Sequence, residues 1–227
     1  MDDTIFDQRS ASEWIASVES EAANVRESDI YPQLRTWLDR HSPREILDIG
    51  CGQGACSQQV DLTKCSYTGV DPSAFLIARA EELFGDSVRR FIVGDAYALP
   101  FAGESFDAAF FVAVWHLLGD LPRAAAELSR VLRDNGTWFI VTANPHAYSL
   151  WTGRYAEGRV DGRRFEGINR LPDGSRTQDT LHLHTMDEIM GALQSNGLEV
   201  IASQEFRTSV KAPTQHLYLS IQGQKFP

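Results

Sequence analysis

Apolar residues recur at helical spacing along the first forty positions of the chain. They predict one amphipathic helix over residues 10–25 and a second from about Ile30 to His41. The positions that define the first helix are Trp14, Ile15, Val18, Ala22 and Val25. In the second helix, the apolar side that is expected to face inward consists of Leu34, Trp37 and Leu38.

From residue 44 onward, short apolar strands alternate with helices. Strands are expected over residues 44–50, 67–71, 90–95, 106–114 and 137–143. Helices are expected over residues 73–84 and 121–133, and Asn135-Gly136 is expected to close the second one in a left-handed conformation. Five strands separated by helices predict an α/β fold with a parallel, doubly wound sheet.

This alternation stops after residue 143 and resumes near residue 183. Residues 144–182 are rich in Arg, Gly and aromatic side chains, and they are expected to form an insertion with short irregular elements. Thr185 and Glu188 have the spacing of a capping box, which predicts a helix that ends near Asn196. Two closing strands are expected over residues 198–206 and 216–222.

Composition and charge narrow the class of protein. The 227 residues suit one domain, and no apolar run approaches the roughly 18 residues of a membrane helix. The acidic start of the chain lacks a signal pattern, so a cytoplasmic location is expected. A net charge of −10 argues against nucleic acid or anionic membrane as a partner. Three cysteines without a CxxC pair indicate neither a disulfide framework nor a zinc cluster.

A glycine-rich loop, Gly50-Cys51-Gly52-Gln53-Gly54, follows the first expected strand and precedes an expected helix. Asp71 lies at the end of the next strand, where a carboxylate can accept both hydroxyls of an adenosine ribose. Alternatively, the glycines serve only a tight turn and Asp71 only caps a helix. A nicotinamide or flavin enzyme would favour the spacing GxGxxG, whereas this loop is GxGxG.

Five motifs follow one another in order along the chain. They are Ile46-Leu47-Asp48-Ile49-Gly50-Cys51-Gly52-Gln53-Gly54, Gly69-Val70-Asp71-Pro72-Ser73, and the segments 94–101, 106–116 and 130–136. In residues, order and spacing they resemble the motifs of the class I S-adenosylmethionine-dependent methyltransferases. The resemblance implies a Rossmann-like, seven-stranded, mostly parallel sheet whose last strand is antiparallel.

The resemblance also implies S-adenosylmethionine as cofactor, with S-adenosylhomocysteine as product. Asp48 would accept from the amino group of the methionine moiety, Asp71 would hold the ribose hydroxyls, and Asp95 would accept from the adenine amino group. The other expected cofactor contacts are Gly50, Cys51, Gly52, Gly54, Pro72, Ser73, Ala96, Tyr97 and Val112. Tyr31 and Arg26 are candidates to reach the methionine carboxylate.

A single domain is therefore expected. It comprises helices over residues 1–43 that fold over the cofactor as a lid, a cofactor-binding core over 44–144, an acceptor-pocket insertion over 145–182, and a closing helix and strands over 183–227.

His116 is the candidate general base, because it follows the fourth strand at the carboxyl edge of the sheet, where ligands bind. Alternatively, His116 packs over the cofactor or caps the next helix. Candidate acceptor contacts are Trp115, His116, Tyr148, Trp151, Arg154 and His182. No carboxylate lies in residues 110–118 to hold magnesium, and two histidines, His182 and His184, are too few to indicate a metal site.

The predicted function is metal-independent methyl transfer to a small molecule, with oxygen favoured as the acceptor atom because of His116. N- or C-methylation of a small molecule is one alternative. A non-catalytic protein that binds S-adenosylmethionine as a regulatory or scaffolding partner is another. A nicotinamide-dependent oxidoreductase is a third, but no Tyr-x-x-x-Lys pair is evident. The sequence leaves the oligomeric state open.

Overall fold

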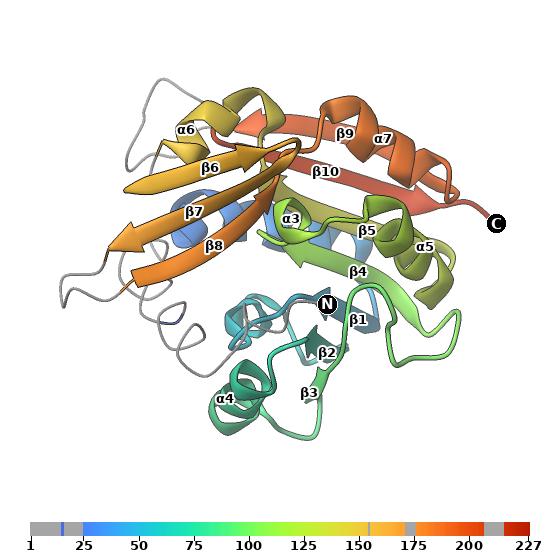
Figure 1. Cartoon of the computed structure of the whole chain (residues 1–227). Helices are drawn as coiled ribbons and strands as arrows, with labels where there is room; N and C mark the ends of the chain where they lie inside the picture. The colour runs from blue at the N-terminus through green and yellow to red at the C-terminus, as the bar shows by residue number, and fades with distance from the viewer. Residues whose placement is uncertain (1–14, 16–24, 154, 171–175, 207–215) are drawn as a thin grey trace.

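The computed structural model describes residues 15, 25–153, 155–170, 176–206 and 216–227 (Figure 1). Most of the helix expected over residues 10–25 therefore lies outside the described residues, as does Arg154.

The main sheet has seven strands in the order β3-β2-β1-β4-β5-β10-β9 (Figure 1). Their bounds are β1 Glu45–Ile49, β2 Ser66–Asp71, β3 Arg89–Val93, β4 Phe106–Val112, β5 Leu132–Ala143, β9 Leu198–Phe206 and β10 Tyr218–Lys225. The first five strands are parallel, and β10 runs antiparallel to both of its neighbours. The predicted Rossmann-like α/β fold is confirmed.

Helices cover both faces of this sheet. The longer ones are α3 Tyr31–His41, α4 Ala74–Phe84, α5 Leu121–Val131 and α7 Met186–Gln194. The short ones are the π-helix η3 Arg26–Ile30, the 3-10 segments η4 Ala55–Gln59, η5 Trp115–Leu117 and η6 Pro145–Ala147, and α6 Tyr148–Thr152. In the part of the chain that these elements span, no helix is long and apolar enough to cross a membrane.

Strand β4 shows why its sequence is almost continuously apolar. Phe110 lies on the α3 side, with its ring edge-on to Trp37 at 6.4 Å between centroids. Its neighbour Phe111 lies on the other side, in the core cluster that α5 and α7 complete. Alternate residues of a strand face opposite ways, so a strand covered on both faces needs apolar residues throughout.

Two sequence expectations about the core need correction. The glycine-rich loop leads into the five-residue segment η4 instead of a full helix. Helix α5 ends at Val131, and Asn135 lies within β5 with φ of 63° instead of closing the helix. The pairing of β4 with β5 shifts register between Phe106 and Ala108, so the left-handed residue accompanies an irregularity of the ladder.

The insertion is more regular than its sequence suggests. It forms a three-stranded antiparallel sheet, called here the insertion sheet, with bounds β6 Glu157–Asp161, β7 Arg164–Arg170 and β8 Arg176–His182. Gly162, with φ of 58°, begins the two-residue turn between β6 and β7. Phe165 and Leu181 face each other across β7 and β8 and are both buried. They share a small core with Ala143 of β5 and Leu217, which precedes β10, so this core joins the insertion sheet to the main sheet.

Candidate active site

The glycine-rich loop begins where β1 ends, at the carboxyl edge of the sheet. Gly50, Gly52 and Gly54 all have left-handed φ values, of 77°, 55° and 82°. A Cβ atom on Gly50 would lie 2.4 Å from Cγ2 of Val114, and one on Gly54 would lie 2.7 Å from Cε1 of Phe91. The loop therefore needs glycine both for its backbone conformation and for close packing.

The side-chain carboxylate of Asp71 holds this loop by a hydrogen bond to the loop's backbone. One carboxylate oxygen accepts from the amide of Gly52 at 3.0 Å, and the other accepts from the amide of Ser73 at 2.9 Å. Ser73, not Asp71, caps α4 by accepting from the amide of Leu76. Burial raises the pKa of Asp71. Because each carboxylate oxygen has two lone pairs, Asp71 keeps acceptor capacity for a ligand.

Asp48 is the next-to-last residue of β1, at the carboxyl edge of the main sheet, and is 1% exposed. Its Oδ2 accepts a hydrogen bond from the hydroxyl of Tyr67. Its Oδ1 is buried and has no hydrogen-bond partner within the described part of the chain. Burial raises the pKa of Asp48 to about 7, and Arg26 acts in the opposite direction. A buried, unpaired carboxylate oxygen suits a ligand that brings a positively charged donor.

Residues near Asp48 complete this end of the site. The buried hydroxyl of Tyr31 forms a hydrogen bond with the guanidinium of Arg26, and burial raises the pKa of that hydroxyl. Cys51 is buried, and a Cβ on Gly69 would lie 2.8 Å from its Sγ. Val112, the last residue of β4, is also buried.

The loop after β3 contains three of the expected cofactor contacts. Asp95 accepts from the amide of Tyr97 at 2.9 Å, and Ala96 between them is half-buried. The hydroxyl of Tyr97 accepts from the amides of Gly119 at 2.7 Å and Asp120 at 3.2 Å. Tyr97 thus ties the loop after β3 to the loop that precedes α5. Pro72, the remaining expected contact on the adenine side, is exposed at the end of β2.

His116 is buried in η5, just past the end of β4. Its Nδ1 accepts from the amide of Ala143 at 3.4 Å and lies 3.2 Å from Oγ1 of Thr142. Its ring centroid is 5.6 Å from that of Trp151. Burial, with a smaller contribution from His184, lowers the pKa of His116 to about 4, so the ring is neutral at pH 7.

The other expected acceptor contacts divide into two groups. Trp151 donates from Nε1 to the carbonyl of Leu217 at 2.8 Å, and the hydroxyl of Tyr148 donates to the carbonyl of His182 at 3.4 Å. These side chains lie with His116 between the main sheet and the insertion sheet. Trp115 is instead in the core cluster of α5 and α7, edge-on to Phe111 at 5.8 Å.

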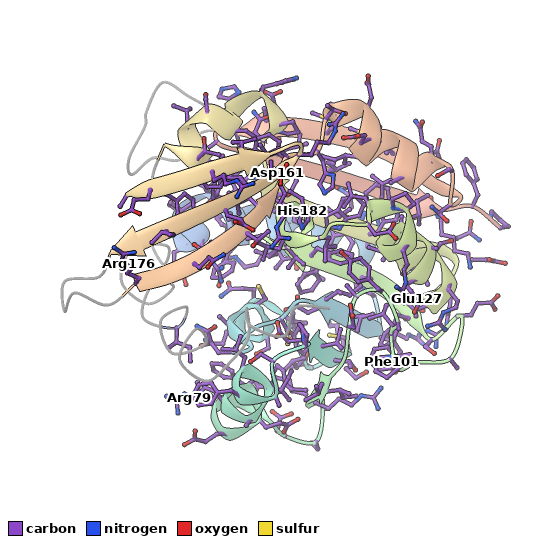
Figure 2. The ribbon with its side chains drawn as sticks, viewed as in Figure 1. Arg79, Phe101, Glu127, Asp161, Arg176 and His182 are labelled. Carbon is purple, nitrogen blue, oxygen red and sulfur yellow. The ribbon has the colours of Figure 1, made fainter. Side chains whose placement is uncertain are left out.

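His182 lies where the insertion sheet approaches the main sheet. Figure 2 shows Asp161 and His182 at this end of the insertion sheet and Arg176 at the other end. A Cβ on Gly119 would lie 2.9 Å from Cε1 of His182, so the ring packs against the loop that follows β4.

From the sequence, His184 is paired with His182 as a possible second base or substrate contact, but it is not among the expected acceptor contacts. It is buried and stacks on His182 at 5.9 Å, and its Nε2 lies 2.6 Å from the carbonyl of Leu118. His184 and Tyr148 line a cavity of about 330 Å³. The sequence shows the two-residue spacing of His182 and His184. It does not show that His184 points toward the core, which only its contact with the carbonyl of Leu118 reveals. Among the described residues, no group of three or more His, Cys, Asp or Glu could hold a metal ion.

Comparison with known proteins matches residues 47–140 to the family described as a methyltransferase domain. A malonyl-[acyl-carrier protein] O-methyltransferase of Legionella pneumophila is 33% identical over 178 residues, which cover 70% of this chain and 62% of that protein. A demethylmenaquinone methyltransferase of Thermotoga maritima is 31% identical over 167 residues, which cover 70% of this chain and 72% of that protein.

Among solved structures, the crystal structure of a SAM-dependent methyltransferase from Methanosarcina mazei has a TM-score of 0.69 and 25% identity. The alignment covers 87% of this chain and 99% of that one. The chain spans 56–62% of the length of the first curated relatives that it matches. The matched sequence, the strand order and the loop at the end of β1 all indicate the same family. The chain belongs to the class I S-adenosylmethionine-dependent methyltransferases.

Proposed function

We propose that the protein transfers the methyl group of S-adenosylmethionine to an oxygen atom of a small molecule, without a metal ion. One observation carries the cofactor half of this proposal: the buried, unpaired Oδ1 of Asp48 beside a loop of left-handed glycines. An ammonium group placed there gives that oxygen a donor and favours the ionised carboxylate. The cofactor's methionine moiety carries such a group.

The neighbouring residues fit the rest of the cofactor. Asp71 keeps lone pairs for two ribose hydroxyls, and Asp95 keeps them for the adenine amino group. Arg26, paired with Tyr31 and close enough to lower the pKa of Asp48, is a candidate for the methionine carboxylate. When bound, the cofactor supplies an electrophilic methyl group on a sulfonium, and the protein has to align an acceptor with it and exclude water.

The acceptor half of the proposal rests on the side chains between the main sheet and the insertion sheet. Trp151 and Tyr148 offer aromatic surface, and His116 and His182 offer polar atoms beside it. Such a mixture suits a small organic molecule. One similar protein is named as a malonyl-[acyl-carrier protein] O-methyltransferase, which agrees with oxygen as the acceptor atom.

Calorimetry tests the cofactor half. We expect S-adenosylhomocysteine to bind with micromolar affinity at pH 8 and NAD not to bind. Asp48→Asn should weaken binding by about 10–100-fold, since a hydrogen bond to a charged group contributes about 1.5–3 kcal/mol. Asp134→Asn, at an exposed carboxylate that pairs with Lys225, is the matched control and should leave the affinity unchanged. Failure of the wild-type protein to bind S-adenosylhomocysteine would refute the proposal.

A turnover assay then separates an enzyme from a protein that only binds the cofactor. The protein is incubated with methyl-labelled S-adenosylmethionine and a panel of small acids, alcohols, phenols and amines. We expect label on an oxygen of at least one compound. Tight binding of S-adenosylhomocysteine without label on any compound would instead support a non-catalytic binding protein.

A further inference from the structure

The end of β4 determines how His116 is oriented. Strand β4 pairs with one edge of β5. The last backbone hydrogen bond of this pairing runs from the amide of Ala113 to the carbonyl of Val141, at 2.8 Å. The next amide on that edge of β5 belongs to Ala143, which is 0% exposed. A buried amide needs an acceptor, and β4 no longer provides one. Nδ1 of His116 takes that place at 3.4 Å.

From this contact we infer which ring nitrogen carries the proton. An imidazole nitrogen that accepts from an amide must present its lone pair, so the proton of the neutral ring is on Nε2. The hydroxyl of Thr142, 3.2 Å from Nδ1, can rotate to donate to the same lone pair. Nε2 makes no hydrogen bond to any described residue, and burial keeps the ring uncharged at pH 7. His116 therefore presents an N–H group.

A general base has the opposite arrangement. A histidine that removes a proton through Nε2 has its Nδ1–H held by a carboxylate or carbonyl, which leaves the lone pair on Nε2. In this protein an amide holds Nδ1, so Nε2, which has no hydrogen-bond partner among the described residues, already carries the proton.

We propose that His116 donates a hydrogen bond from Nε2 to the acceptor molecule and that the methylated atom is a carboxylate oxygen. This inference rests on the proposed function and narrows its acceptor class. A carboxylate is ionised at pH 7 and needs no base. One of its oxygens takes the Nε2–H bond of His116, and the other attacks. A lone pair of that oxygen forms the O–CH3 bond while the electrons of the S–CH3 bond remain on sulfur. The anion and the sulfonium become a neutral ester and a neutral thioether, and no proton is released.

A hydroxyl acceptor would have to pass its proton to another group. His184 influences the pKa of His116, His182 stacks on His184, and burial lowers the pKa of both. His184 already directs Nε2 toward the carbonyl of Leu118 at 2.6 Å. Proton transfer to either histidine is therefore the competing hypothesis, and it would give an ether product instead of an ester.

The tautomer of His116 can be measured without any substrate or cofactor. In protein with nitrogen-15 in its histidines, long-range proton–nitrogen NMR spectra show which ring nitrogen carries the proton. His116→Gln identifies the His116 signals by their loss. Thr142→Val, which changes only the contact at Nδ1, identifies them if the first variant does not fold. We expect an Nε2–H ring at pH 7. An Nδ1–H ring or a charged ring would overturn the proposal.

Acceptor chemistry provides the second test. Methyl-labelled S-adenosylmethionine is offered with octanoate, benzoate or phenylacetate, and with 1-octanol and octylamine as matched compounds that lack a carboxylate. Mild alkali then releases methanol from an ester but not from an ether or a methylamine. We expect label only with the acids and only in alkali-labile form. Label on 1-octanol or octylamine, or no label on any acid while S-adenosylhomocysteine binds, would refute the carboxylate assignment. Absence of S-adenosylhomocysteine binding would refute the proposed function instead.

Two variants separate a donor from a base in the same assay. His116→Gln keeps an N–H donor near the position of Nε2 but has no basic nitrogen. His116→Leu keeps neither group. A donor role predicts that the Gln variant stays within about tenfold of wild type, while the Leu variant loses about 10–100-fold. A base role predicts losses of about 10²–10⁴-fold in both variants, and that result would contradict the proposal.

Discussion

Alanine substitutions at three glycines separate two costs in the glycine-rich loop. One is the cost of a left-handed backbone, and the other is the steric cost of an added methyl group. Gly50 has φ of 77°, and a Cβ there would lie 2.4 Å from Cγ2 of Val114. Gly197 has a similar φ of 72° but no atom within 4 Å of the position of a Cβ. Gly191 lies inside α7 and is also open. Replacing each by alanine therefore adds a methyl group under three different conditions.

The expected magnitudes follow from these conditions. Gly191→Ala should stabilise the protein by about 0.5–1 kcal/mol, because alanine loses less conformational freedom in a helix. Gly197→Ala should destabilise it by about 1–2 kcal/mol, the cost of a left-handed residue that has a Cβ. Gly50→Ala has the same cost plus about 1–3 kcal/mol of overpacking against Val114, which gives about 2–5 kcal/mol in all.

Urea unfolding at pH 8, monitored by circular dichroism, measures all three variants against wild type. Equal denaturant slopes m are required, so that shifts in the midpoint report stability and not a change in the unfolded state. If Gly50→Ala costs no more than Gly197→Ala, Val114 moves aside without penalty. The conclusion that close packing requires a glycine at residue 50 would then be wrong.

Further substitutions test other parts of the site. The pKa of Asp48, about 7, lies above its ordinary 3.8, so ionising it costs stability as pH rises from about 4 to 7. Asp48→Asn should therefore raise the melting temperature more at pH 8 than at pH 5, and an equal change at both would contradict this. Tyr97→Phe should cost about 0.5–1.5 kcal/mol by urea unfolding and speed hydrogen exchange at Gly119, because that amide loses its acceptor. Ala113→Gly should change the free energy of unfolding by between zero and about 1 kcal/mol in the stabilising direction. It removes left-handed strain at φ of 61°, but it also raises the conformational entropy of the unfolded chain. A clear loss of stability in Ala113→Gly would show that the residue is not strained.

The sequence predicts the strand–loop–strand arrangement at the ends of β1 and β2 well, because its signals are local. The apolar strand, the glycine-rich loop and the acid after the next strand lie in order along the chain. The parallel arrangement of neighbouring strands then brings the ends of β1 and β2 together. The hydrogen bond from the amide of Gly52 to Asp71 is the direct result of that arrangement.

The insertion was harder to predict, because its strands bury little. The five residues of β6 are all exposed, and only a few side chains, such as Phe165 and Leu181, reach a core. Charged residues alternate irregularly with the few apolar ones along these strands, so the periodicity of a half-buried strand is weak. The alternation around Phe165 and the turn glycine Gly162 were the available signals, and they were too short to outweigh the irregular composition.

The role of His116 could not be derived from its position in the sequence. Its orientation depends on where β4 ends relative to β5, and that boundary depends on the left-handed turn at Ala113. A sequence motif places a histidine at the edge of the sheet but does not say which of its nitrogens meets the backbone. The amide of Ala143 decides this, and it acts across 27 residues of sequence.

Several unfavourable features gather where β1 and β4 end. Asp48 has a buried oxygen without a donor in the described structure, Ala113 has a left-handed backbone, and Gly50 turns sharply against Val114. Each lowers the stability of the protein by itself, and each lies beside the proposed cofactor site. An ammonium group bound at Asp48 would remove the first of these costs, because it supplies the missing donor and favours the ionised carboxylate. The fold therefore holds Asp48 in a state that a cationic ligand stabilises more than water does, which is the reason to place the cofactor's amino group there.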